Sequence, residues 1–285
     1  MCNIVRLAGV AVALTLSSFA GAPASAANIV FVSAVSGNDG TCTGSTTSPC
    51  RTLGVALSKA FSGDVIQLET GGNYFGSTIT NMSITIYSPH GAGIFGGESP
   101  CLNINVRATD VVTLDGIQCV PAQGNNGIVF NTGEKLRIRN SSIHGAGGAL
   151  CGVLFQPNSG AELFIEHSII SENGTSNGGG GVCVAPRAKA VVSGVIDRLT
   201  SQNNRYSLRA NGNTNLLVQN SIFSNNFVAL SATGAASILR ISNDSIYKNN
   251  VGLQSLTGGQ LISVGDNVLV ANTTNGAFTS TEAKQ

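Results

Sequence analysis

The sequence reads LLVQNSIFSNNF at residues 216–227 and LRISNDSIYKNN at residues 239–250, so nearly the same phrase returns after 23 residues. Asparagine recurs at this interval, in the series Asn203, Asn226, Asn249 and Asn272. Ahead of these asparagines, apolar residues occupy every second position, as Leu216 and Val218 do before Asn226. Such alternation is typical of a β-strand with one buried face. The sequence therefore predicts one such strand in each repeat.

A second short strand is expected after each asparagine. Aligning the central apolar residues of these strands gives the series Val129, Leu154, Cys183, Leu208, Leu230, Leu253 and Phe278. A fixed period in the low twenties with two or more short strands per repeat predicts a solenoid. The signatures of leucine-rich and helical repeats are absent. We therefore expect an all-β, single-domain parallel β-helix of about ten coils, each stacked ~4.8 Å above the last.

The repeated asparagines have a structural explanation. Asn220 and Asn243 fall in one column of the predicted stack, which also contains His167, and the series that begins with Asn203 falls in another. Asparagine tolerates left-handed backbone at a corner, and stacked amides can bond from coil to coil. A ligand site lined by asparagine is the less favoured interpretation, because turn chemistry already accounts for these positions.

The first 26 residues are interpreted as a secretory signal peptide. Arg6 precedes an apolar run, and Ala24–Ala26 fits the small-residue rule for cleavage. A retained membrane anchor is the weaker alternative, because the apolar run is short and is interrupted by Thr15, Ser17 and Ser18. No later stretch is long enough to cross a bilayer, so we expect a secreted or periplasmic protein without membrane insertion.

Residues 27–64 are expected to form an N-terminal cap with a short helix over Leu53–Phe61, and residues 65–285 to form the β-helix. A solenoid needs such a cap because the open edge of its first coil would otherwise recruit other chains.

Charge is sparse and balanced, with 15 Lys and Arg against 14 Asp and Glu. No basic stripe indicates a nucleic-acid partner, and no polybasic run indicates an anionic membrane.

Six cysteines follow the predicted signal peptide, and an even number in an exported chain favours disulfides over a zinc site. The expected pairs are Cys42–Cys50, Cys101–Cys119 and Cys151–Cys183. The third pair meets an obstacle, because Cys183 is expected to point inward at the position of Leu154. Cys151 lies three residues earlier on its own coil, which is ~10 Å of strand and beyond disulfide reach. A register shift at the glycines 178–181 would be needed to join them.

The sequence also resembles a known family. GNDGTCTGSTTSPCRTLGVAL (37–57), GDVIQLETGGNY (63–74) and SITIYSP (83–89) are similar to the start of right-handed parallel β-helix proteins with a pectin-lyase-like fold. ISVGDNVLVANTTNGAF (262–278) resembles the last coil of a bacterial, mostly uncharacterised subgroup of exported β-helix proteins. The resemblance covers nearly everything after the signal peptide, but it implies an architecture and not a reaction.

Members of this superfamily that cut polysaccharides carry motifs that this chain lacks or matches only in part. Of the polygalacturonase-like motifs NTD, DD, GHG and RIK, only the last has a partial match, at Arg137–Arg139. Ser88–Gly91 departs from the DPHE-like element of mannuronan epimerases at both acidic positions. Calcium would enter only if the chain were a lyase, and no other cofactor or metal is expected.

One charged column is a candidate catalytic site. Stacking the predicted strands places Asp115, Arg139 and Glu166 at outward positions on three successive coils. The two carboxylates would lie ~9.6 Å apart, near the spacing of an inverting glycosidase pair. The arginine between them could grip a uronate carboxylate. The favoured interpretation is nevertheless a solvated charge ladder that avoids stacking like charges.

A second candidate surface is a binding strip. Phe130 and Phe155 are expected at successive outward positions, followed by Val184 and Arg209. The chain has no Trp and only four Tyr, so other stacking platforms for sugars are scarce. The favoured alternative is that the Gly-rich excursions 145–149 or 174–181 cover this strip.

These observations favour an exported, non-catalytic β-helix that binds extracellular polysaccharide or a surface partner. The first alternative is a polysaccharide lyase or glycoside hydrolase that uses the Asp115, Arg139 and Glu166 column. The second is a structural component of the cell envelope.

Overall fold

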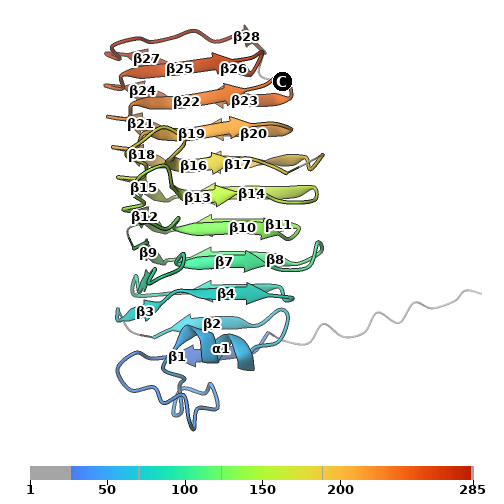
Figure 1. The fold of residues 1–285 in the computed structure, drawn as a ribbon, viewed down its shortest axis with the longest axis vertical. Coiled ribbons are helices and arrows are strands. Elements are labelled where there is room, and N and C mark those ends of the chain that lie inside the picture. Colours follow the sequence, from blue (N-terminus) through green and yellow to red (C-terminus); the bar gives the residue numbers. More distant parts are fainter. Residues whose placement is uncertain (1–26, 70, 123, 188, 284–285) are drawn as a thin grey trace, which may run out of the picture.

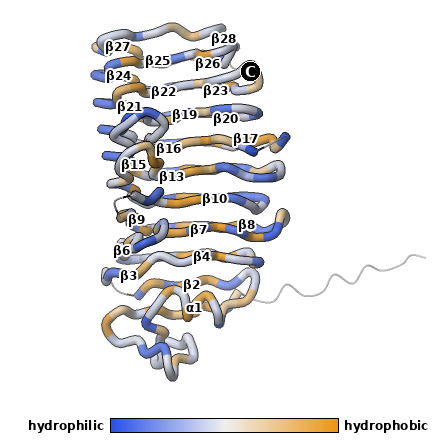
Figure 2. Tube along the Cα trace, in the orientation of Figure 1, coloured by the Kyte–Doolittle hydropathy of each residue, from blue (hydrophilic) through white to orange (hydrophobic). Residues whose placement is uncertain are grey.

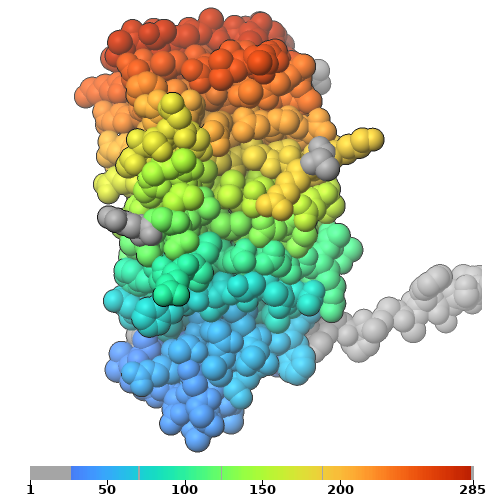
Figure 3. Space-filling view, in the orientation of Figure 1, coloured from blue at the N-terminus to red at the C-terminus, as the bar shows by residue number. Residues whose placement is uncertain are grey.

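The structure is a computed structural model that describes residues 27–283 except 70, 123 and 188. The signal peptide predicted for residues 1–26 lies outside the described residues. The chain winds around one axis, and successive coils add parallel strands to three sheets, which we name A, B and C (Figure 1). Figure 3 shows the result as one column that runs from the N-terminal to the C-terminal coils. The prediction of an all-β solenoid is confirmed.

The described strands have the following bounds. Sheet A contains β1 (Ile29–Val32), β2 (Val65–Leu68), β5 (Ile84–Tyr87), β8 (Val111–Asp115), β11 (Lys135–Arg139), β14 (Ala161–Glu166), β17 (Val192–Asp197), β20 (Thr214–Gln219), β23 (Ser237–Ser242), β26 (Gln260–Gly265) and β28 (Ser280–Thr281). Sheet B contains β3 (Asn73–Phe75), β6 (Gly93–Phe95), β9 (Gln118–Val120), β12 (Ser142–His144), β15 (Ile169–Ser171), β18 (Thr200–Gln202), β21 (Ile222–Ser224), β24 (Ser245–Tyr247) and β27 (Val268–Val270). Sheet C contains β4 (Ser77–Thr80), β7 (Leu102–Asn105), β10 (Ile128–Thr132), β13 (Cys151–Phe155), β16 (Gly180–Val184), β19 (Tyr206–Asn211), β22 (Val228–Thr233) and β25 (Val251–Leu256). Sheet C has eight strands, so about eight coils contribute to all three sheets, against about ten coils predicted.

One coil shows how the sequence builds the three sides. In β20, Leu216 and Val218 are buried, and the chain then turns at Asn220, whose φ is 54°. The short strand β21 buries its middle residue, Phe223, and a second left-handed residue, Asn225 with φ of 56°, leads into β22. Left-handed backbone is costly for most residues but tolerated by asparagine, so the asparagines set the corners. Figure 2 shows hydrophobic positions recurring on successive coils along the column.

Buried asparagines form a ladder along the corner between sheets B and C. The ladder contains Asn173, Asn204, Asn226, Asn249 and Asn272. From Asn204 onward, the side-chain oxygen of each member accepts the backbone N–H of the member before it at 2.9 Å. The same oxygen accepts the preceding Nδ2 at 2.9 to 3.1 Å. Since buried amides need partners, the ladder stabilises one stacking register over all others.

The ladder differs by one residue from the predicted column. Asn203 takes the left-handed turn, with φ of 57°, and its neighbour Asn204 occupies the ladder. Both positions are asparagine, so the sequence pattern did not distinguish the turning residue from the buried one. The predicted turn role is confirmed for Asn220, Asn243 and His167, which all have positive φ.

The N-terminal cap covers one edge of the first coils. The helix α1 (Leu53–Lys59) begins after Thr52, whose hydroxyl accepts the N–H of Val55 at 3.3 Å. It packs against β1 and β4, and β4 is the edge strand of sheet C. The helix therefore shields an edge that would otherwise be open to pairing. The predicted helix is confirmed, although it ends before Phe61.

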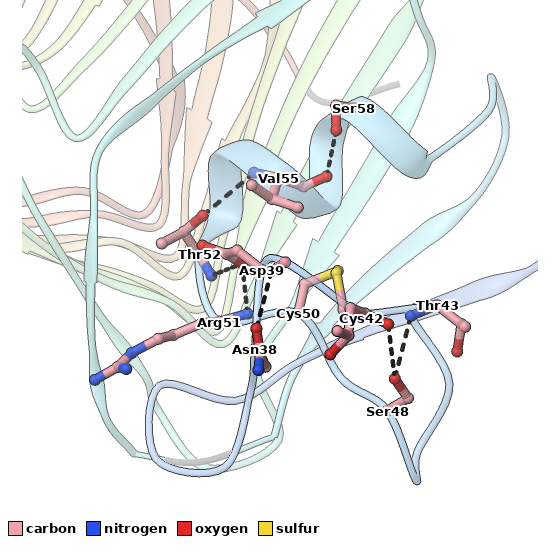
Figure 4. The surroundings of a disulfide bond; sticks show 12 residues. Asn38, Asp39, Cys42, Thr43, Ser48, Cys50, Arg51, Thr52, Val55 and Ser58 are labelled. Carbon is pink, nitrogen blue, oxygen red and sulfur yellow. Dashed lines mark hydrogen bonds between the residues drawn. A yellow bond between two sulfur atoms is a disulfide. The ribbon is translucent and has the colours of Figure 1, made fainter.

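Asp39 ties the disulfide loop of the cap to α1. Its carboxylate accepts the N–H groups of Arg51 at 2.8 Å and Thr52 at 3.0 Å (Figure 4). Partial loss of hydration raises the pKa of Asp39, but the hydrogen bonds from Thr52 and Arg51 and the charge of Arg51 outweigh it, so the pKa lies below its usual value.

All three predicted disulfides are present. The Cα atoms are 4.9 Å apart in Cys42–Cys50, 6.0 Å in Cys101–Cys119 and 6.1 Å in Cys151–Cys183. The predicted inward direction of Cys183 was wrong, because its neighbours Val182 and Val184 belong to the core and Cys183 lies on the outer face of β16.

A second ladder lies at the corner between sheets A and B. The side chains of Ser221, Asp244 and Asn267 each accept a backbone N–H from the preceding coil, and Asp244 is the acidic member of these three. Its Oδ1 accepts the N–H of Ser221 at 2.6 Å, and its own N–H donates to Asn267 at 2.9 Å. Asp244 is only 1% exposed, and its Oδ2 is buried without a hydrogen-bond partner. Burial raises the pKa of Asp244 to about 7; the Ser221 N–H opposes this shift and the charge of Asp197 adds to it.

Replacing Asn226 with Ala should destabilise the fold. The change leaves the buried N–H of Asn204 without its acceptor, at a cost of about 1–3 kcal/mol, whereas Nδ2 of Asn204 keeps the carbonyl groups of Ile170 and Gln202. Urea unfolding followed by circular dichroism measures the loss. Asn250→Ala, at an exposed neighbouring position, is the control. Equal losses in the two variants would contradict a structural role for the ladder.

Asp244→Asn should remove a pH dependence of stability. The folded state favours the neutral acid, so its stabilisation is complete below the unfolded pKa of 3.8 and is lost as pH rises to about 7. Linkage bounds this loss at about 4 kcal/mol. Asparagine supplies a neutral amide at every pH, so the variant should be more stable than the native protein at pH 8 and similar to it at pH 4. If the two proteins differed in unfolding free energy by the same amount at pH 4 and at pH 8, the raised pKa of Asp244 would be refuted.

Candidate functional site

The predicted charged column exists. Asp115 pairs with Arg139, and Arg139 with Glu166, at the ends of the adjacent strands β8, β11 and β14. The column also extends in both directions, with Tyr87 preceding Asp115 and Asp197 following Glu166. The predicted register is therefore confirmed for these three residues, while their catalytic role stays a prediction.

Asp115 is held by its neighbours on the next coil. One carboxylate oxygen lies 3.0 Å from Nε of Arg139, and the other accepts Nδ2 of Asn140 at 2.8 Å. The side chain of Asp115 is 13% exposed, whereas that of Arg139 is 48% exposed. Both contacts fix the orientation of the carboxylate. Asp115 thus positions the arginine, whose terminal amino groups have no partner among the described residues.

Asp197, which follows Glu166 in the column, contacts an arginine and an asparagine as Asp115 does, whereas Glu166 differs from both. Asp197 forms an ion pair with Arg198 at 3.1 Å and accepts Nδ2 of Asn220 at 2.6 Å. His167 lies between these coils, with Nε2 3.0 Å from Nη1 of Arg198. Glu166 is exposed, and no described side chain bonds to its carboxylate. It is therefore the one acid of this column that is free to meet a ligand.

Two adjoining hollows lie along the corner between sheets A and B. Tyr87, Asp115 and Asn140 line the first hollow. Asn140 and His167 line the second, together with Gln118 of sheet B. Arg139 and Glu166 lie on the adjoining outer face of sheet A. A flexible chain with hydroxyl and carboxylate groups could therefore contact both surfaces at once.

The predicted phenylalanine strip was wrong. Phe130 and Phe155 are fully buried, and their rings stack inside the solenoid with centroids 4.5 Å apart. Val184 is also buried. Val129, Leu154 and Cys183 belong to the outer column instead, because Ile128, Val153 and Val182 pair in the inward register of Leu208. A shift of one residue exchanges the two faces of a strand, which explains the error.

Arg209 does lie in the outer column of sheet C, between Cys183 and Ser231. It is partly buried with its guanidinium 5.6 Å from the ring centroid of Tyr206. Desolvation lowers the pKa of Arg209, which the electrostatic effect of Tyr206 partly offsets. Because Phe130 and Phe155 are buried, Arg209 is not the end of an exposed aromatic strip.

The described residues bear on both metal binding and membrane insertion. Over residues 27–283, apart from the three gaps, no three His, Cys, Asp or Glu side chains are grouped closely enough to hold a metal ion. A calcium site therefore stays tied to the lyase alternative as an untested expectation. In the same part of the chain, no helix has the length and apolar character needed to cross a bilayer.

Sequence reasoning missed two outward aromatic residues on sheet B. Phe75 and Phe95 end the three-residue strands NYF and GIF and pair with each other on adjacent coils. Their middle residues, Tyr74 and Ile94, are buried. The available signal was the apolar middle position of each triplet, which turns the flanking residues outward.

Comparison with known proteins identifies the fold. Neither a protein-family model nor a curated protein matches the sequence. Among solved structures, the chain is similar to the crystal structure of pectate lyase Pel9A, with a TM-score of 0.59 and 15% sequence identity. The match covers 90% of this chain and 78% of that chain. The protein therefore has the right-handed parallel β-helix of the pectin-lyase-like fold, and this distant similarity extends to the fold alone.

Phe130→Ala should destabilise the protein without affecting ligand binding at the surface. Removing a stacked, fully buried ring should cost about 3–5 kcal/mol of unfolding free energy. Phe61→Ala is the control, because Phe61 is 74% exposed. Chemical denaturation compares the two variants, and a Phe130→Ala protein as stable as the control would contradict the buried assignment.

Proposed function

We propose that the protein is an exported, non-catalytic β-helix that binds acidic polysaccharide through the Asp115, Arg139 and Glu166 column. The observation that carries this proposal is the state of Arg139. Asp115 holds its Nε at 3.0 Å while about half of the side chain stays exposed to solvent. A fixed guanidinium with free terminal donors suits a planar carboxylate, which it can bind through two parallel hydrogen bonds.

The surrounding groups suit the remainder of a uronate chain. Asn140 and His167 line the adjoining hollows and can bond to sugar hydroxyls. The Glu166 carboxylate is a free acceptor for hydroxyl groups. Tyr87, at the other end of the column, offers part of an aromatic ring for contact with a sugar face. Regular coil spacing places these groups at successive levels along the solenoid, where an extended polymer can contact several of them.

The state of Asp115 favours binding over proton transfer. A general acid or base must direct an oxygen at the substrate, but Asp115 directs its two oxygens at Arg139 and Asn140. A general base needs a free lone pair directed at the substrate, and both oxygens of Asp115 are already engaged. In this proposal Asp115 is a positioning residue for Arg139.

A polysaccharide lyase or glycoside hydrolase is the alternative function. Glu166 favours it, because this exposed carboxylate lies two coils from Asp115, at ~9.6 Å along the stack. The similar structure is that of a pectate lyase, so analogy of fold also supports this chemistry. In that case Glu166 would be the base and Arg139 would bind the substrate carboxylate.

Export is part of the proposal. The three disulfides suit an oxidising compartment, either the periplasm or the exterior of the cell. The predicted signal peptide supports the same location.

Arg139→Gln should weaken binding to polygalacturonate about tenfold or more, because a hydrogen bond to a charged group contributes about 1.5–3 kcal/mol. Isothermal titration calorimetry measures the affinity. Arg240→Gln is a matched control, since Arg240 also lies on sheet A and pairs with an acid, Glu282, at 2.8 Å. Equal losses in both variants would show that net charge, and not this site, determines binding.

The same samples test the enzymatic alternative. The non-catalytic proposal predicts neither unsaturated products absorbing in the ultraviolet nor new reducing ends after incubation with polygalacturonate, alginate or neutral polysaccharides. Release of either product by the native protein, and its loss in Glu166→Gln, would overturn the proposal in favour of a lyase or hydrolase.

A further inference from the structure

The outer face of sheet B carries an aromatic surface at its N-terminal end. Each strand of this sheet is three residues long (Figure 1). Because its middle residue faces the core, its first and third residues face outward. In β3 and β6 the third residues are Phe75 and Phe95, which pair in register on adjacent coils. The next strand, β9, presents Gln118 at its first position.

Phe75 is unusually exposed for a strand phenylalanine. Its exposed fraction is 74%, whereas Phe130, Phe155 and Phe223 are fully buried. Its ring lines a hollow at the edge of the cap together with Arg51 and Asn73. The Arg51 side chain extends away from the disulfide loop (Figure 4), and its charge also acts on Asp39. An exposed ring, an amide and a cation therefore meet in one place.

Phe95 lies flat on the sheet because a glycine makes room for it. A Cβ atom added to Gly93 would lie 2.6 Å from Cε2 of Phe95, so the ring occupies the space of the neighbouring side chain. Phe95 is partly exposed. The ring therefore covers the strand at Gly93, and its exposed part is available to a ligand. Any larger residue at position 93 would displace it.

We propose that Phe75 and Phe95 form a stacking platform for the sugar rings of a uronate-containing polysaccharide. Aromatic faces pack against the apolar faces of sugar rings, while amides and cations at the rim bind hydroxyl and carboxylate groups. Arg51 supplies the charge that complements a uronate, and Asn73 and Gln118 supply the amides. This inference rests on the proposed function and identifies where the polymer continues beyond Arg139.

The platform is continuous with the column of the proposed function. Gln118 pairs with Gly93, the residue over which the Phe95 ring lies, and it also lines the hollow that contains Asn140 and His167. From β3 to β12 the tract covers three coil steps, or ~14 Å along the axis. The polymer would therefore run roughly parallel to the solenoid axis, over sheet B and past the corner where sheet A begins.

Phe75→Ala tests the platform with little risk to folding, because the ring is mostly in solvent. It should weaken binding of polygalacturonate about threefold to tenfold. Phe61→Ala is a matched control, since Phe61 has the same exposed fraction of 74% but lies outside sheet B. Gly93→Ala should weaken binding to a similar extent by displacing the Phe95 ring, with circular dichroism reporting whether the variant is folded. Isothermal titration calorimetry measures all affinities.

The outcomes separate the two proposals. If Phe75→Ala binds as tightly as Phe61→Ala while Arg139→Gln binds weakly, the platform is overturned and the proposed function stands. If Phe75→Ala is weakened and Arg139→Gln is not, the platform stands and the binding site of the proposed function is overturned. If the native protein binds neither polygalacturonate nor alginate, both proposals are overturned.

Discussion

The hydrogen bond from a backbone N–H to the asparagine side chain one coil later holds the coils between Ala146 and Asn272 in register. Asn204, Asn226 and Asn249 each make this bond within a buried corner, where water cannot replace a lost partner. Sheet pairing alone would allow neighbouring strands to slip by a residue or more. The ladder adds a side-chain bond that only one register satisfies, so it selects the stacking that the parallel sheets then extend.

Register determines what the surface can do. Because the coils stack in one alignment, a residue at the end of a sheet A strand lies directly beside its counterparts on the coils before and after it. Asp115 and Arg139 meet for this reason, although 24 residues separate them in the sequence. The same geometry that brings an acid to an arginine also makes them neutralise each other. A column of paired charges leaves few groups free, and in the proposed function the free terminal donors of Arg139 contact the polymer.

The departures from regularity are informative for the same reason. Asp244 stands where its ladder neighbours use a hydroxyl or an amide, and its buried second oxygen makes the fold sensitive to the protonation of one carboxyl group. Gly93 interrupts the outer face of sheet B, and the Phe95 ring fills the space. In both places the backbone follows the repeat and the side chain does not, so a new property arises without a change in architecture.

The sequence by itself determined the solenoid, the corner role of Asn220 and Asn243, the cap helix, the cysteine pairs and the register of Asp115, Arg139 and Glu166. These features depend on short-range patterns, namely alternation within a strand and a constant interval between turns. Only the tertiary structure decided which faces of sheet C point inward, because a strand has a period of two and a one-residue error exchanges core and surface. The alignment was correct from Val129 to Cys183 but slipped by one residue at the next coil, where Cys183 pairs with Arg209 and not with Leu208. Phe130, Phe155 and Cys183 were therefore assigned to the wrong faces. The pairing of Phe75 with Phe95 also required the structure, since their coils precede the regular repeats and share no interval with them.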